Sequence, residues 1–193
     1  MSELSSFEDL EREIEKTKEE FYSETGGKNM FFKKSQKYDC AKKVVDTFSL
    51  ETLLKRTCCI IENSNSVHID YPILKTYASP EVFDAISEFI IMNFQHVKNT
   101  YGCLNVYLNL DSFTVSAAER YKGLIEAFCA KCFQKNTGFA PVVTAFVVYN
   151  SPKMIESIGH IVMPLMEENV KKKLHVCKKE ESGQYNQMFY SRA

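Results

Sequence analysis

Two cysteines three residues apart are the first candidates for chemistry in this chain. Cys129 and Cys132 form a CxxC pair, the spacing of redox dithiols and of half a zinc site. The pair falls within an amphipathic helical pattern, whereas a redox thiolate needs a helix N-terminus or a neighbouring cation to lower its pKa. No second CxxC accompanies it, although Cys58-Cys59 and four histidines are present. We therefore predict buried free cysteines that pack as small apolar side chains, and no metal site.

A nucleophile, a base and an orienting group would have to come from Asp111, Ser112, His160 and His175. No GxSxG sequence places a serine on the strained turn of a hydrolase. Asp111 follows an apolar run, at a strand end where α/β sheets collect ligands, but one carboxylate there is more often a cap or a turn acceptor. The sequence therefore predicts no catalytic residues, no enzyme activity and no cofactor.

A glycine pair followed by lysine, Gly26-Gly27-Lys28, is a second candidate for ligand chemistry. It lacks the GxxxxGK(S/T) spacing of a phosphate-binding loop, and no buried strand precedes it. Gly-Gly most often marks a turn or hinge, so we predict a flexible linker here.

Apolar patterning predicts the elements that must position these residues. A run at 142–149 is almost entirely apolar, β-branched or aromatic, which is typical of a strand buried on both faces. Further strands are predicted at 71–77 and 104–110, with helices between the strands. Short connections between parallel strands require right-handed crossovers. We expect an α/β domain with a mixed or mostly parallel small sheet, flanking helices and an N-terminal helical extension.

The strand at 104–110 has two different faces. One face carries Leu and Val alone, whereas the other combines Tyr107 with Asn105 and Asn109. The mixed face suits the wall of a ligand cavity with a few orienting groups. It suits equally well a sheet face that a helix half covers, and the sequence leaves both interpretations open.

An amphipathic helix is predicted at 153–166, directly after the buried strand and an Asn150-Ser151-Pro152 turn. Its apolar stripe consists of Ile155, Ile158, Val162 and Leu165. Gly159 lowers the local helix propensity by about 1 kcal/mol relative to alanine, which permits a hinge. An ordinary core helix would have the same stripe.

This order of strand, turn, apolar helix, proline, basic segment and short strand resembles the C-terminal half of a CRAL-TRIO domain. The residues that carry the resemblance are Tyr149-Asn150-Ser151-Pro152 for the turn, Met163-Pro164-Leu165-Met166 for the helix ending and Lys172-Lys173-Leu174-His175-Val176 for the last strand. Residues 106–111 correspond to the preceding parallel strand, and the resemblance covers residues 70 to 178.

The resemblance implies a lipid-binding fold in which the 153–166 helix is a mobile gate over a phospholipid or another hydrophobic ligand. The ligand contacts that it implies are Tyr107, Phe146, Ile155, Ile158, Val162 and Leu165. The basic residues Lys171, Lys172 and Lys173 would meet an anionic head group or an acidic protein partner, with about 1 kcal/mol per side chain near an anionic membrane.

A second hypothesis comes from the small size of the core, with 70 residues before Tyr71. This compactness resembles the BCH-type branch of the superfamily, whose members act chiefly as protein-interaction and scaffold modules. The chain would then be a non-catalytic interaction or structural subunit with no lipid bound, using its N-terminal arm and C-terminal tail as contacts.

Composition limits the function classes further. With 193 residues, 45% of them hydrophobic, the chain can bury one sizeable core, and a net charge of −1 does not suggest a nucleic-acid binder. Residues 1–25 carry nine acidic and three basic side chains, whereas 28–56 carry eight basic and three acidic ones. We predict an acidic N-terminal arm at 1–25, a basic helical segment at 26–66, the CRAL-TRIO-like domain at 67–178 and a tail at 179–193.

The expected setting is intracellular and cytoplasmic. Seven cysteines, an odd number, and the lack of an apolar leader after Met1 favour a reducing compartment. The longest apolar run has about nine residues, whereas about twenty are needed to cross a bilayer. We therefore expect a soluble or peripheral membrane protein.

Overall fold

The computed structural model of the chain describes residues 7–27, 33–133 and 138–190. Three helices come first, and they are α1 (Phe7–Glu24), α2 (Lys33–Phe48) and α3 (Leu50–Thr57). Leu10 and Ile14 of α1 and Val44 of α2 are almost fully buried, so the N-terminal helices join the core. Ser49 separates α2 from α3 and caps α3, because its hydroxyl accepts a hydrogen bond from the Thr52 amide.

Gly26 and Gly27 form a turn after α1, both with positive φ, as the predicted linker requires. Lys28, the third residue of that motif, lies outside the described residues.

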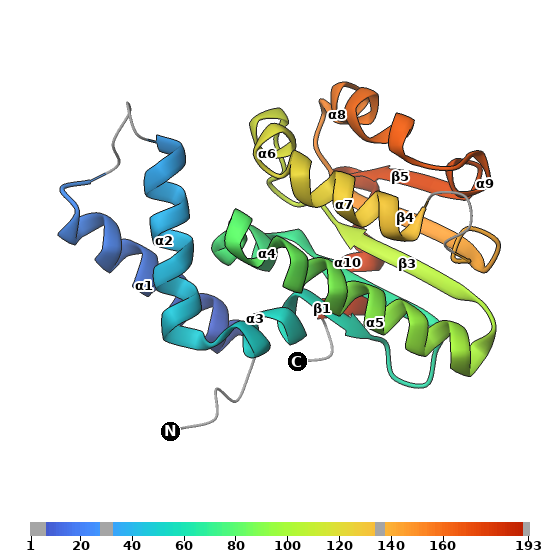
Figure 1. Cartoon of the computed structure of the whole chain (residues 1–193), viewed down its shortest axis with the longest axis horizontal. Coiled ribbons are helices and arrows are strands. Elements are labelled where there is room, and N and C mark those ends of the chain that lie inside the picture. The colour runs from blue at the N-terminus through green and yellow to red at the C-terminus, as the bar shows by residue number, and fades with distance from the viewer. Residues whose placement is uncertain (1–6, 28–32, 134–137, 191–193) are drawn as a thin grey trace.

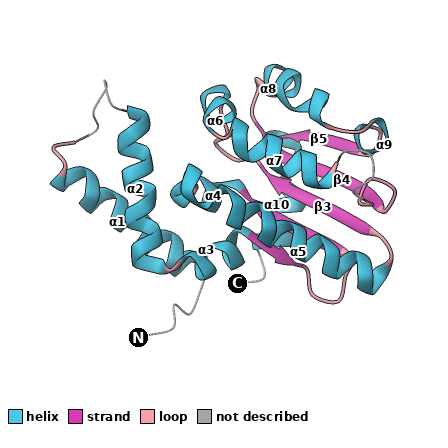
Figure 2. Cartoon of the chain, viewed as in Figure 1, coloured by secondary structure: helices cyan, strands magenta, loops and turns pink. Residues whose placement is uncertain are grey.

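A five-stranded sheet follows, in the order β1-β2-β3-β4-β5. Its strands are β1 (Cys58–Ile60), β2 (Ser66–Asp70), β3 (Leu104–Asn109), β4 (Val143–Ser151) and β5 (Leu174–Lys178). Strand β1 runs antiparallel to β2, and the other neighbours are parallel. The predicted α/β fold with a mostly parallel sheet and an N-terminal helical extension is therefore confirmed (Figure 2).

The crossover segments lie on one face of the sheet (Figure 1). They contain α4 (Tyr71–Tyr77), η1 (Pro80–Val82), α5 (Phe83–Tyr101), α6 (Val115–Arg120), α7 (Lys122–Cys132), α8 (Ile155–Val162), η2 (Met163–Leu165) and α9 (Glu168–Lys171). Parallel strands in sequential order with right-handed connections place every crossover on the same side. The long helix α5 packs on β1, β2 and β3, and α7 packs beside α5.

The strand predicted at 71–77 is wrong. These residues form helix α4, and the first parallel strand is β2, a few residues earlier. All five side chains of β2 are buried, and Pro72 in the first turn of α4 has no backbone N–H to give to a sheet. His68 and Asp70 concealed the strand, because polar residues are rare in a strand buried on both faces.

The opposite face of the sheet is covered by the C-terminal tail. After η3 (Lys179–Glu181), helix α10 (Gly183–Tyr190) lies behind the sheet in Figure 1. The Phe189 ring stacks on His68 at 4.2 Å between centroids and lies 5.3 Å from Tyr107. Tyr185 packs on Tyr149 at 5.4 Å. The tail therefore docks as a helix through aromatic contacts.

His68 is held neutral in this aromatic layer. Its Nε2 shares a 2.7 Å hydrogen bond with the Tyr149 hydroxyl, and its side chain is 5% exposed. Burial lowers the pKa of His68 from 6.5 to about 4, because the charged imidazolium loses its hydration there.

We predict that acid weakens the fold through His68. An unfolded chain protonates this histidine near pH 6.5 and the folded chain near pH 4, so stability is complete above pH 6.5 and falls as the pH drops toward 4. The loss is about 3 kcal/mol at most. Urea unfolding at several pH values will measure it in wild type and in His68→Gln, in which this dependence is lost.

The matched control is His175→Gln, because His175 is exposed on β5. This variant should keep the wild-type slope of unfolding free energy against pH. Equal slopes for wild type and His68→Gln between pH 4 and 6.5 would show that His68 is not the responsible group.

Candidate functional site

Helix α8 lies between two points at which regular secondary structure is interrupted. Before it, Asn150 has a left-handed backbone with φ 51°, and Pro152 ends strand pairing. After it, Pro164 sits in the short helix η2. The main contacts of α8 outside its own segment are with α6 rather than with a strand, and η2 packs on α7. The α8 segment is thus a separate piece of the helical layer.

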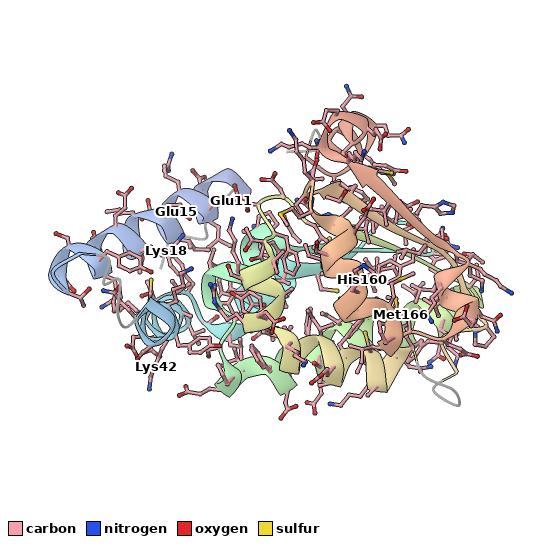
Figure 3. All side chains as sticks on the ribbon, turned by 90° about the horizontal axis from the view of Figure 1, so that it is seen from above. Glu11, Glu15, Lys18, Lys42, His160 and Met166 are labelled. Carbon is pink, nitrogen blue, oxygen red and sulfur yellow. The ribbon has the colours of Figure 1, made fainter. Side chains whose placement is uncertain are left out.

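The apolar stripe of α8 faces the core. Ile158 is 3% exposed, whereas Ile155 and Val162, together with Leu165 of η2, are half-buried and pack against the buried core. Figure 3 shows this segment beside the α6–α7 region, with His160 on it and Met166 just after it. Met154, directly before the helix, is 59% exposed. The four predicted gate residues therefore share one packed face.

The two predicted contacts on the strands lie on opposite faces of the sheet. Phe146 pairs in register with Val106, and its ring lies 5.4 Å from that of Phe133 on the helix-covered side. Tyr107 pairs with Val147 and faces α10. Because side chains alternate along a strand, Tyr107 cannot line the same cavity as Phe146 and the α8 stripe.

A hollow of about 600 Å³ lies along the flank of α8. Its lining residues are Glu156, Gly159, His160, Met163, Pro164 and Lys171. Lys171 also forms an ion pair with Glu168 at 2.6 Å, and Lys173 donates to the Ala140 carbonyl at 3.2 Å. Lys172 is exposed. The structure brings the basic segment to the end of the α8 region, with Lys171 at the edge of the hollow.

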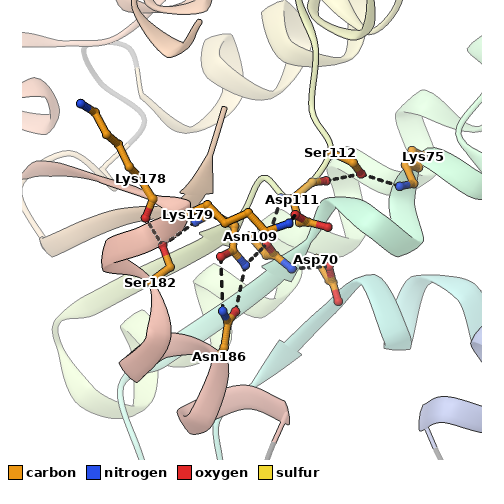
Figure 4. Close-up of polar contacts among 10 residues, drawn as sticks. Asp70, Lys75, Asn109, Asp111, Ser112, Lys178, Lys179, Ser182 and Asn186 are labelled. Carbon is orange, nitrogen blue, oxygen red and sulfur yellow. Dashed lines mark hydrogen bonds and ion pairs between the residues drawn. The ribbon is translucent and has the colours of Figure 1, made fainter. Parts of the chain in front are cut away.

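A buried polar network holds the carboxyl ends of β2, β3 and β4 together (Figure 4). The Asn109 amide donates to Asp70 Oδ1 at 3.1 Å, and Asn150 donates to Asn109 Oδ1 at 3.0 Å. Asn150 also donates to Asn186 of α10 at 2.9 Å. Asn109 and Asn150, at the ends of successive strands, are the sequence signal for this network, and neither was predicted to form it. It fixes the strand end from which α8 departs.

Asp111 and Ser112, which a catalytic group at this strand end would need, have other partners. Lys179 donates to Asp111 at 2.7 Å, and Lys75 donates to the Ser112 hydroxyl at 2.6 Å. Within the described ranges, no hydrogen bond joins Ser112 to a histidine. The geometry thus does not assemble a nucleophile with a base at this strand end.

Comparison with known proteins now identifies the fold family. The CRAL/TRIO domain matches residues 49–191 of the chain, which is most of its length. This chain belongs to the CRAL/TRIO domain family. The family binds hydrophobic ligands such as lipids, and the match includes α10 as well as the sheet.

A solved structure supports the CRAL/TRIO fold. The crystal structure of Sfh5 is similar with a TM-score of 0.56 and 16% sequence identity. The similarity covers 69% of this chain and 53% of the Sfh5 chain, so the CRAL/TRIO chain spans about half the length of that relative. No curated protein sequence matches the chain.

No helix in the described part of this CRAL/TRIO chain is long and apolar enough to cross a bilayer. In the same residues, no group of three histidine, cysteine or acidic side chains is placed to hold a metal ion.

The CxxC pair is buried in α7. Cys129 is 2% exposed and Cys132 is fully buried, and burial raises the pKa of each thiol to about 12. A thiolate at neutral pH is therefore strongly disfavoured at both positions. The pair packs α7 onto the core, as an apolar residue would.

We predict that Cys129 and Cys132 resist alkylation in the native CRAL/TRIO domain. Iodoacetamide at neutral pH should label the exposed Cys59 and the half-buried Cys103 and Cys177 before this pair, because it needs an accessible thiolate. Peptide mass spectrometry will locate the labels, and the same protein in urea provides the fully labelled reference. Native labelling of Cys129 at the rate of Cys103 would contradict the burial.

Proposed function

We propose that this CRAL/TRIO chain binds one hydrophobic, lipid-type ligand beneath α8 and has no enzyme activity. The observation that carries the proposal is the way in which α8 packs. An amphipathic helix lies between the Asn150–Pro152 turn and Pro164. It packs its apolar stripe on neighbouring helices rather than on the sheet. Such a segment can lift without breaking any strand pairing, so a ligand can take the place of its contacts.

This proposed gate has one hinge in the stretch after Asn150, in addition to the hinge that Gly159 permits within α8. Asn150 has a left-handed backbone, which costs about 1 kcal/mol or more for a residue other than glycine. The Asn150 side chain donates a hydrogen bond to Asn109, and the Asn150 backbone N–H donates one to the Ser182 hydroxyl at 2.8 Å. These two bonds hold that conformation in place. The strand end therefore stays fixed, and the movement begins at Pro152.

The ligand would lie between the stripe of α8 and the helix-covered face of the sheet. Phe146 supplies the floor, and Ile155, Ile158, Val162 and Leu165 supply the cover in this proposal. The buried Ser151 hydroxyl at the base of α8 has no hydrogen-bond partner in the described structure. A polar group of the ligand would satisfy it, because an unpaired buried hydroxyl costs free energy.

The basic segment would assist at a membrane. The exposed Lys172, together with Lys171 and Lys173 beside it, would attract an anionic lipid surface to the end of the gate. Their present contacts with Glu168 and a carbonyl oxygen are weak enough to exchange, because ion pairs at a surface contribute little.

The close packing of Ile158 favours an alternative function. If α8 does not open, the domain is a rigid unit without a ligand, which suits the protein-interaction role of the BCH-type branch. The charged N-terminal arm and the docked C-terminal tail would then provide contacts to a partner. Ligand content separates the two functions.

Native mass spectrometry of freshly purified protein, with organic extraction of the same sample, tests the proposal. A discrete added mass that extraction releases as a lipid is the expected result. An unliganded mass, together with no uptake of labelled phosphatidylcholine from vesicles, would support the interaction module instead.

We predict that a polar change under the gate abolishes lipid uptake. Ile158→Asn places an amide in the apolar layer that the ligand would occupy, and uptake of fluorescent phosphatidylcholine should fall about tenfold or more. Met154→Asn is the control, since Met154 is exposed, and its uptake should match wild type. Thermal unfolding of both variants separates lost binding from lost folding.

We predict that Gly159→Ala slows ligand exchange. A β-carbon at Gly159 meets nothing closer than the Met163 Cγ at 3.9 Å, so alanine fits. Alanine stabilises the helix by about 1 kcal/mol, which should slow opening several-fold while the melting temperature stays the same or rises. Stopped-flow transfer between vesicles measures the rate, and an unchanged rate would contradict a hinge at this glycine.

A further inference from the structure

A second cavity lies between the N-terminal helices and the CRAL/TRIO domain. It has a volume of about 650 Å³, and its walls come from α1, α2, α4, the loop after β3 and α6. Figure 3 shows α1, with Glu15 and Lys18, alongside α2. No residue of α8 or η2 is among its lining residues, so this cavity is separate from the proposed lipid site.

The charged side chains that line this cavity are all cationic. Four half-buried cationic side chains line it, and they are Lys18, Lys37, Lys75 and Arg120. None of the described lining residues is acidic. Lys18 is compensated by Glu15 at 2.5 Å outside the lining set. Like charges gathered in a partly desolvated space repel one another, so an anion would stabilise this arrangement.

Two of these cations have no acidic partner among the residues that the structure describes. Neither Arg120 nor Lys75 forms an ion pair within the described ranges of the chain. Lys75 donates to the Ser112 hydroxyl and lies 6.0 Å from the centroid of the Tyr71 ring. The Arg120 guanidinium lies 5.6 Å from the centroid of the Tyr121 ring. Both cations are positioned by aromatic and hydroxyl groups, which leave their charge uncompensated.

Arg120 occupies a central place among the tyrosines of the cavity. Burial raises the pKa of Tyr22, Tyr38, Tyr71 and Tyr121, and the positive charge of Arg120 opposes that rise at each of them. One guanidinium thus acts on hydroxyls from α1, α2, α4 and the start of α7. The walls also carry the hydroxyls of Ser112, Thr114 and Ser116.

We propose that this cavity binds a phosphate monoester, with Arg120 and Lys75 as the main contacts to the phosphate. Such a group carries up to two negative charges near neutral pH and three strong acceptor oxygens, which match a cavity rich in cations and hydroxyl donors. Guanidinium binds phosphate through two parallel hydrogen bonds. The cavity volume suits a small organic phosphate, whose carbon part would pack on the tyrosine rings.

The phosphate comes either from a soluble metabolite or from the head group of a phosphorylated lipid. In both cases the ligand would join α1 and α2 to α4 and α6, because its contacts come from both groups of helices. Binding would therefore hold the N-terminal helices against the CRAL/TRIO domain and raise the thermal stability of the whole chain.

The full chain will be titrated with phenyl phosphate by isothermal titration calorimetry. Arg120→Gln and Lys75→Gln should each weaken binding about tenfold or more, because each removes a charge-assisted contact. The matched control is Lys122→Gln, a neighbouring exposed lysine near Glu126 that does not line the cavity, and its affinity should equal wild type. Arg120→Lys should recover part of the loss, and thermal unfolding without ligand will confirm that the variants fold.

Vesicles of phosphatidylcholine with and without phosphatidate distinguish the two sources. Binding to phosphatidate vesicles alone, lost in Arg120→Gln and Lys75→Gln, would assign a lipid head group, whereas binding of phenyl phosphate assigns a soluble phosphate. No binding to either probe, or an equal loss in Lys122→Gln, would overturn the proposal. Ile158→Asn should leave phosphate binding unchanged, so failure of the lipid site and failure of this site are separately visible.

Discussion

The handedness of the strand crossovers is the constraint on which the rest of this structure depends. Four parallel strands follow one another in sequential order, and right-handed connections then place every intervening helix on one face of the sheet. The other face would expose His68, Tyr107 and Tyr149 to water. Helix α10 covers them, and it lies within the family match, which continues past the last strand to residue 191. The tail completes the domain.

The same topology determines where a movable element can exist. Helix α5 is held by three strands, whereas α8 is the crossover to the edge strand β5 and packs mainly on another helix. Its departure point is fixed by Asn150, which the polar network ties to Asn109 and Asn186. A strand end fixed by hydrogen bonds and a helix that packs mainly on another helix lie next to each other in the sequence. In the function proposed above, that combination would let α8 move without disturbing the sheet.

The sequence predicted the parts of the fold that have simple periodicity. Strands β3 and β4 and the α8 region were found, because continuous apolar runs and a stripe at helical spacing need no knowledge of the rest of the chain. Strand β2 was missed because His68 and Asp70 are stabilised there by contacts with β3, β4 and α10 that come from distant residues. Helix α4 was taken for a strand, although Pro72 already indicated a helix start. The role of Tyr107 was beyond prediction, because α10 decides what its sheet face contacts.

The basic residues differ in the same way, because one group is contiguous in the sequence and the other is brought together only by folding. Lys171, Lys172 and Lys173 are consecutive, so any sequence scan detects them, yet two of them already contact a glutamate or a carbonyl oxygen. The cations of the 650 Å³ cavity come from positions 18, 37, 75 and 120, where no motif connects them. Tertiary packing, including that of α1 on α2 and of α2 on α4, brings them around one space. A dispersed, half-buried set of cations in a cavity lined by no acidic residue is stronger evidence for an anion than a contiguous run, even though Lys18 is paired with Glu15, because a run can remain fully solvated while a half-buried set cannot.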